Sequence, residues 1–130
     1  MGGMTKASED SGRTASTVLV VDDEPDIRFL LKITLERSGY NVIEASHGEA
    51  ALELVRVSRP ALVITDRMMP RMDGTELITT LRGDEGTSAI PIIMLTGTNG
   101  PQVGADALMT KPFELQALIE LVASLIGEEH

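Results

Sequence analysis

From Thr17 onward, short apolar runs rich in β-branched residues alternate with amphipathic stretches of helical spacing. Such alternation predicts parallel strands covered by helices, so the predicted class is α/β. Strands are expected over residues 18–21, 41–45, 61–65, 91–95 and 107–109. Helices are expected to begin at Pro25, at a capping-box pattern of Ser46 and Glu49, near Gly74 and at Phe113. The chain has 130 residues and no internal repeat, which is the size of one domain with one core.

Polar residues follow closely on four of these strands, namely Asp22 and Asp23, Asp66, Thr96 and Lys111. In an open parallel α/β sheet the functional cleft lies beyond the carboxyl ends of the strands. Three carboxylates at one edge repel one another unless some are protonated or a cation lies among them. A site that offers oxygen ligands without histidine or cysteine suits Mg²⁺, so Mg²⁺ is the expected cofactor.

An aspartate carboxylate is an established nucleophile for phosphoryl groups, and phosphoryl transfer needs mainly in-line positioning and charge neutralisation. Asp66 is the candidate acceptor, Lys111 can neutralise charge and Thr96 can donate a hydrogen bond. Taken singly, each residue also has a structural explanation, such as a helix cap for Asp23 or a solvated side chain for Lys111. Their arrival at one edge from separate strands is the specific signal.

The amino-acid composition limits the kinds of partner that the chain can bind. Acidic side chains outnumber basic ones 20 to 11, and the net charge of -9 argues against a broad nucleic-acid-binding surface and against a basic membrane-binding patch. The apolar runs are too short to span a membrane. With no cysteine, disulfides and thiolate chemistry are excluded, which fits a cytoplasmic protein. Residues 1–16 are expected to form a disordered leader, 17–127 the domain and 128–130 a tail.

Four blocks carry a family resemblance: VLVVDDEP, LVITDRMMPRMDG, IPIIMLTG and TKPF. In order and spacing they resemble the signature blocks of response-regulator receiver domains of two-component signalling, over about residues 17–127. The resemblance implies a flavodoxin-like, doubly wound parallel sheet of five strands in the order 2-1-3-4-5.

Site roles also follow from the resemblance, residue by residue. Asp66 would accept the phosphoryl group, Asp23 would bind Mg²⁺ directly and Asp22 would act through metal-bound water. The backbone carbonyl of Met68 would be a further metal ligand. The remaining assignments are Thr96 as the hydroxyl that moves toward the phosphoryl group, Lys111 as its cationic partner, and a cis bond before Pro112.

The sequence departs from the family pattern between Thr96 and Lys111. Residues 97–110 must hold a strand as well as the crossover, and they include glycines and a proline, so the fourth helix is expected to be absent or reduced to a turn. This departure resembles an atypical receiver subgroup. Leu108 stands where receivers commonly carry a Tyr or Phe that reports phosphorylation, so no aromatic switch is available there.

The expected function is a phospho-acceptor switch that takes phosphate from a histidine kinase or phosphotransfer protein and acts by binding a downstream protein. No enzymatic activity is expected beyond assistance to its own phosphorylation and dephosphorylation. An alternative is a receiver domain excised from a larger regulator or hybrid kinase. Two other functions are disfavoured. An aspartyl-phosphate hydrolase would use an Asp-x-Asp pair and a cap domain, and neither is seen in the sequence. A flavodoxin-like FMN carrier would use a Ser/Thr/Gly phosphate loop where this chain has Asp22 and Asp23, whose charges repel a phosphate.

His47 is expected to be a surface side chain. Met68, Met69 and Met72 are expected to plug the base of the third helix.

Overall fold

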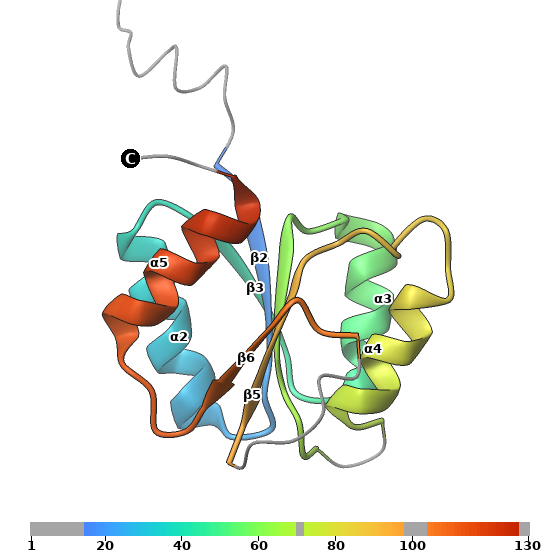
Figure 1. Cartoon of the computed structure of the whole chain (residues 1–130), viewed down its shortest axis with the longest axis horizontal. Coiled ribbons are helices and arrows are strands. Elements are labelled where there is room, and N and C mark those ends of the chain that lie inside the picture. The colour runs from blue at the N-terminus through green and yellow to red at the C-terminus, as the bar shows by residue number, and fades with distance from the viewer. Residues whose placement is uncertain (1–14, 70–71, 98–103, 128–130) are drawn as a thin grey trace, which may run out of the picture.

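A computed structural model describes residues 15–69, 72–97 and 104–127. One parallel sheet forms its centre, with α2 and α5 on one face and α3 and α4 on the other (Figure 1). The strands are β2 (Thr17–Val21), β3 (Asn41–Ala45), β4 (Leu62–Asp66), β5 (Ile92–Thr96) and β6 (Ala107–Thr110). The helices are α2 (Pro25–Arg37), α3 (Gly48–Ser58), α4 (Gly74–Arg82) and α5 (Leu115–Ile126).

The strand order is β3-β2-β4-β5-β6, and every neighbouring pair is parallel. Counted along the chain this is 2-1-3-4-5, so the predicted flavodoxin-like topology is confirmed. The order reverses at β2, whose neighbours are β3 and β4. Because all five strands point the same way, their carboxyl ends lie along one edge, which is the lower edge in Figure 1.

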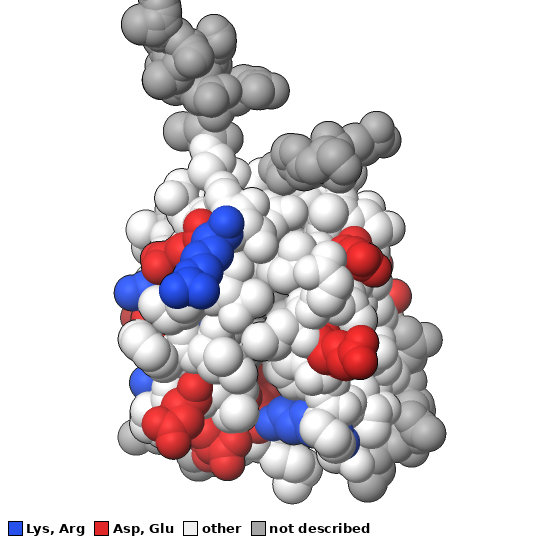
Figure 2. Space-filling view, turned by 90° about the vertical axis from the view of Figure 1, so that its left-hand side faces the viewer, with Lys and Arg blue, Asp and Glu red and all other residues white. Residues whose placement is uncertain are grey.

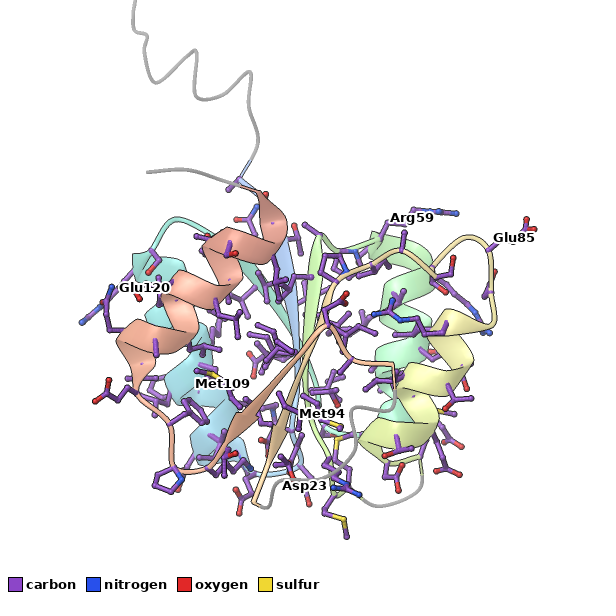
Figure 3. All side chains as sticks on the ribbon, in the orientation of Figure 1. Asp23, Arg59, Glu85, Met94, Met109 and Glu120 are labelled. Atoms are coloured by element: carbon purple, nitrogen blue, oxygen red, sulfur yellow. The ribbon has the colours of Figure 1, made fainter. Side chains whose placement is uncertain are left out.

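The sheet is buried on both faces, which is why its central strands are uninterrupted apolar runs. In β2, Val18 and Val20 join the core under α2 and α5, whereas Leu19 and Val21 join the core under α3 and α4. The same alternation separates Met94 and Met109, which point toward opposite helix layers (Figure 3). The central strands therefore carry little that is polar until they reach the carboxyl edge.

The start of α3 differs from the expected capping box of Ser46 and Glu49. Ser46 is exposed, and the helix begins one step later, with His47 as its N-cap. The Nδ1 atom of His47 accepts a hydrogen bond of 3.2 Å from the backbone N–H of Ala50. A capping box is present at α4 instead, where Asp73 and Glu76 exchange backbone-to-side-chain bonds of 2.9 and 3.1 Å.

The crossover from β5 to β6 bears on the expectation of a lost fourth helix. Gly97 and residues 104–106 are not helical, and residues 98–103 lie outside the described residues. In chain order the fourth described helix is Leu115–Ile126, the helix that was expected after Lys111. Membership of the atypical subgroup is therefore not confirmed.

Arg82 ties the chain that enters β6 to the last turn of α4. Its guanidinium donates to the carbonyl of Gly104 at 2.9 Å and to the carboxylate of Asp106 at 2.7 Å. The same Asp106 oxygen accepts from the backbone N–H of Ile92 at 2.7 Å. The last turn of α4, the start of β5 and the approach to β6 are thus joined at the amino end of the sheet, away from the carboxyl edge.

The expected leader and tail fall mostly outside the description, because residues 1–14 and 128–130 are not among the described ones. Ala15 and Ser16 are described, and their carbonyls accept hydrogen bonds from Asn41 at 3.3 and 2.9 Å. No helix in the described part of the chain combines the length and the apolar character needed to cross a membrane.

Candidate functional site

Three carboxylates meet at the carboxyl edge of the sheet. Asp22 and Asp23 follow β2, and Asp66 is the last residue of the neighbouring β4. Each offers one oxygen that lies within 4.8 Å of the others, and Asp23 is the exposed member (Figure 3). The strand order predicted this meeting, because strands one and three are adjacent in it.

Asp22 is the most enclosed of the three, with 0 % of its surface exposed. Its Oδ1 accepts a hydrogen bond of 2.9 Å from the backbone N–H of Glu24, while its buried Oδ2 has no hydrogen-bond donor. Burial raises the pKa of this carboxyl, and the negative charge of Asp66 adds to the rise against the opposing effects of the Glu24 bond and of Lys111. A buried carboxylate oxygen without a donor has the chemistry of a cation ligand.

Lys111 brings a positive charge to the same place. Its Nζ donates to Asp66 Oδ1 at 3.2 Å and lies 3.7 Å from Asp22 Oδ2. Partial burial alone would lower the pKa of this ammonium group, but the hydrogen bond to Asp66 and the charges of Asp66 and Asp22 outweigh burial and raise it. Lys111 is therefore held in its charged form. The peptide bond between Lys111 and Pro112 is cis.

Asp66 has little freedom to move. Besides the lysine, its Oδ1 accepts a bond of 2.9 Å from the backbone N–H of Arg67. Its backbone is pressed by α4, because a Cβ added at Gly74 would collide with the Asp66 carbonyl. Asp66 is thus held at its carboxylate by Arg67 and Lys111 and at its backbone by α4.

Thr96 reaches this edge as the last residue of β5. It is 3 % exposed, and its carbonyl accepts a bond of 2.7 Å from the backbone N–H of Lys111. In the sheet register Asp66 lies opposite Leu95, so Thr96 stands one residue further toward the edge. The measured distances show that Asp22, Asp23, Asp66 and Lys111 lie close together, and the strand register shows that Thr96 lies at the same edge.

The structure also bears on the expectations for the three methionines and for Leu108. The side chain of Met68 is 72 % exposed, whereas Met69 is buried in the core under α3 and α4 and Met72 packs against that core. The expectation that all three methionines plug the helix base is therefore wrong for Met68, which the chain turns outward just after Asp66. Leu108 is partly buried and packs against the same core.

The residues present fit a magnesium ion. The cluster supplies oxygen ligands alone, one of them a buried oxygen that lacks a donor. Such hard ligands suit Mg²⁺, which usually keeps several waters and binds few protein carboxylates. Figure 2 shows acidic side chains gathered along the lower end of the face that α2 and α5 form, with basic groups beside them.

One residue of the site was missed by sequence reasoning. Arg28, in the first turns of α2, donates from its Nη1 to the backbone carbonyl of Asp22 at 2.8 Å. Its Nε also donates to Glu44 at 3.3 Å. The available signal was its position six residues after Asp22 and three after Pro25, where a long cationic side chain can fold back over the end of the strand.

Comparisons with known proteins agree with this geometry. A family model for the response regulator receiver domain matches residues 18–123. The alkaline phosphatase synthesis transcriptional regulatory protein PhoP of Bacillus subtilis is 46% identical over 103 residues, which cover 74% of this chain and 42% of PhoP. The receiver domain of a signal transduction histidine kinase from Syntrophus aciditrophicus has a TM-score of 0.83 at 34% identity, covering 87% of this chain and 91% of that one.

The chemotaxis protein CheY4 of Vibrio cholerae has a TM-score of 0.80 at 32% identity, covering 85% of this chain and 98% of CheY4. The chain thus covers nearly the whole of these solved domains. It spans about half the length of the curated relatives it matches, 42% for PhoP and 51% for the phosphate regulon regulator PhoB of Pseudomonas aeruginosa.

Proposed function

Because the chain belongs to the response regulator receiver family, we propose that it is a phospho-acceptor switch of a two-component phosphorelay, phosphorylated on Asp66. The observation that carries this proposal is the hydrogen bond between Lys111 Nζ and Asp66 Oδ1 beside the buried, donor-free oxygen of Asp22. A fixed nucleophile, a held ammonium group and a candidate cation site within one small volume suit phosphoryl transfer.

The chemistry of each residue follows from its place. An Asp66 carboxylate oxygen attacks phosphorus while the bond to the leaving nitrogen or oxygen of the donor breaks, and the departing group keeps that electron pair. Oδ1 is engaged by Arg67 and Lys111, so we assign the attack to Oδ2. Lys111 then neutralises a phosphoryl oxygen and the Thr96 hydroxyl donates to another.

A bound Mg²⁺ supplies further neutralisation of the phosphoryl oxygens. Asp23 and Asp66 would hold it directly, Asp22 through water, and the Met68 carbonyl as a further ligand. The cluster brings the three aspartates together, and the role of the Met68 carbonyl follows from the family resemblance alone.

The proposed donor is a histidine kinase or a phosphotransfer protein, and the proposed output is contact with another protein in the cytoplasm. We assign no further catalytic activity to the domain, and no nucleic-acid binding of its own, in line with its net charge of -9. DNA binding by the whole protein is a separate matter, since the relative RpaA of Synechocystis is a DNA-binding transcriptional regulator.

A second arrangement has specific support. The chain matches 42% of PhoP, and the solved relative from Syntrophus aciditrophicus is the receiver domain of a histidine kinase. These likenesses favour a receiver that works within a longer regulator or hybrid kinase. The length of the natural gene product decides between the two arrangements.

Membership of the subgroup with a reduced fourth helix also remains a proposal. It is supported by the short stretch from 97 to 110, which includes glycines and a proline. In that case the signal would travel through Thr96 and the backbone after it, as a shift between two loop arrangements. Amide spectra of the free and phosphorylated domain that show no change beyond Thr96 would contradict this route.

Phosphorylation itself is tested by intact mass after incubation with acetyl phosphate and Mg²⁺. We expect one phosphoryl adduct on the wild type, none with EDTA and none on Asp66→Asn. Asp84→Asn, which changes a carboxylate far from the cluster, is the matched control and should be modified like the wild type. An adduct on Asp66→Asn, or one that forms in EDTA, would contradict the proposal.

A further inference from the structure

Arg28 joins α2 to the end of β2 by a bond that no catalytic role accounts for. Its Nη1 donates to the Asp22 carbonyl at 2.8 Å, and its side chain is 21 % exposed. Glu44 on β3 holds the other side of the guanidinium through the 3.3 Å bond to Nε. The planar fork of an arginine can serve two such acceptors at once, which a lysine cannot do in the same geometry.

The carbonyl that Arg28 holds belongs to the peptide that joins Asp22 to Asp23. The N–H of Asp22 is the last to bond across to β3, at 3.1 Å to the Ala45 carbonyl. Beyond that point the chain has left the sheet, and its Asp22 carbonyl is bonded to a side chain instead of a strand. The orientation of this peptide sets the direction in which the next residue, Asp23, leaves the strand end.

We propose that Arg28 is a positioning residue for the cation site, acting through the Asp22–Asp23 peptide. The guanidinium fixes the plane of that peptide and so holds the two carboxylates at the mutual distance that a cation requires. This role rests on the proposed function, because it concerns the affinity for Mg²⁺ at the cluster. The side chain of Arg28 bonds to the Asp22 backbone carbonyl and to Glu44, and so acts on the cluster through the backbone.

Two effects of Arg28 oppose each other, and their balance can be measured. A positive charge close to a cation site weakens cation binding by repulsion, whereas an ordered ligand pair strengthens it. Glu44 pairs with the guanidinium at 3.3 Å and also lies 3.9 Å from the Lys32 ammonium, so it offsets part of the charge that the site experiences. We expect positioning to outweigh the remaining repulsion, so loss of the guanidinium should weaken Mg²⁺ binding.

The test uses Arg28→Gln and Arg28→Lys, with Arg37→Gln as the matched control. Arg37 is in the last turn of the same helix, roughly 13 Å further along its axis. Calorimetric titration with Mg²⁺ gives the affinity, and the carbonyl ¹³C shift of Asp22 in metal-free protein reports the lost bond. We expect about tenfold weaker binding for Arg28→Gln, the usual scale for groups that orient metal ligands. The Mg²⁺ affinity of Arg28→Lys should lie between those of Arg28→Gln and the wild type, and the affinity of Arg37→Gln should match that of the wild type.

Unchanged or tighter binding by Arg28→Gln would overturn the positioning role, as would weaker binding with an unmoved Asp22 carbonyl signal. Thermal unfolding of each variant shows that the fold is kept, and Arg28→Lys carries the test if Arg28→Gln does not fold. Failure of the wild type to bind Mg²⁺ would instead contradict the proposed function, and with it the role that depends on it. The two failures are therefore distinguishable.

Discussion

Lys111 and Asp66 are 45 residues apart in the chain, yet the Lys111 ammonium donates to Asp66 Oδ1 across 3.2 Å. The lysine follows β6 and the aspartate ends β4, with β5 between them in the sheet. Their contact depends on the carbonyl of Thr96, which binds the Lys111 backbone N–H at 2.7 Å and so sets where the lysine leaves the sheet. The same ammonium lies 3.7 Å from Asp22, where it competes with any other cation.

Replacing this lysine should separate catalysis from metal binding. In Lys111→Met, phosphorylation by acetyl phosphate should slow on the order of 10²-fold, the scale for loss of one charge-stabilising donor. Mg²⁺ should bind about fivefold tighter, because unit charges about 4 Å apart interact by roughly 1 kcal/mol in a watery setting. Lys32→Met is the control, since that partly exposed ammonium pairs with Glu44 on β3 at 3.9 Å. Weaker Mg²⁺ binding by Lys111→Met would contradict the competition.

The buried Asp22 predicts a pH effect on metal-free protein. Burial and the charge of Asp66 raise its pKa above the ordinary value of 3.8, so the folded state binds this proton more tightly than the unfolded state does. The contribution of Asp22 to stability is therefore greatest at low pH and is lost as pH rises through the folded pKa. The substitution Asp22→Asn removes this loss of stability at higher pH.

In urea unfolding with EDTA at pH 7, Asp22→Asn should be more stable than the wild type by about 1–2 kcal/mol, the scale for relief of a buried oxygen that lacks a hydrogen-bond donor. The difference between the two proteins should shrink as the pH falls toward 4. Glu53→Gln, an exposed carboxylate on α3, should show no such difference. A destabilised Asp22→Asn at pH 7 would refute this account of Asp22.

Two glycines offer a matched pair for testing how closely α4 packs on Asp66. Gly74→Ala should lower the free energy of unfolding by about 1–3 kcal/mol, because the new Cβ meets the Asp66 carbonyl. Gly83→Ala should change it by less than about 0.5 kcal/mol, since its nearest neighbour would be Thr79 O at 3.5 Å. Urea unfolding measures both. Equal effects of the two substitutions would show that α4 does not press on Asp66.

The cap of α3 can be tested against the pattern that the sequence suggested. His47→Ala should cost about 1 kcal/mol, because the N–H of Ala50 loses its acceptor. His47→Asn should restore most of this stability. Ser46→Ala should be close to neutral in the same urea measurement, whereas a cost at Ser46 that exceeds the cost at His47 would favour the capping box.

Much of the fold follows from periodicity. Strands buried on both faces read as apolar runs, and polar residues begin where the strands end, so the place of Asp22, Asp66 and Thr96 was predictable. The resemblance then supplied the strand order, which brings β2 and β4 together. At the end of α5, Gly127 takes the left-handed conformation, with a φ of 87°, that favours glycine.

Contacts between distant elements were harder to predict. Ser46 and Glu49 satisfy the capping-box pattern, but His47 is the cap, and Gly48 packs so closely on Met72 that an added Cβ would collide. A pattern of side-chain types carries no information on such a tertiary contact. The bond from Arg28 to the Asp22 carbonyl joins a side chain to a backbone atom, so its only trace in the sequence is the position of Arg28 shortly after Asp22.

The most direct test of the central claim identifies the residue that carries phosphate. Protein treated with acetyl phosphate and Mg²⁺ is reduced with borohydride, which converts an aspartyl phosphate to homoserine, and its peptides are sequenced by tandem mass spectrometry. We predict conversion at Asp66 alone, dependent on Mg²⁺ and absent with EDTA. Conversion at Asp23 or at another carboxylate, with Asp66 unmodified, would contradict the claim.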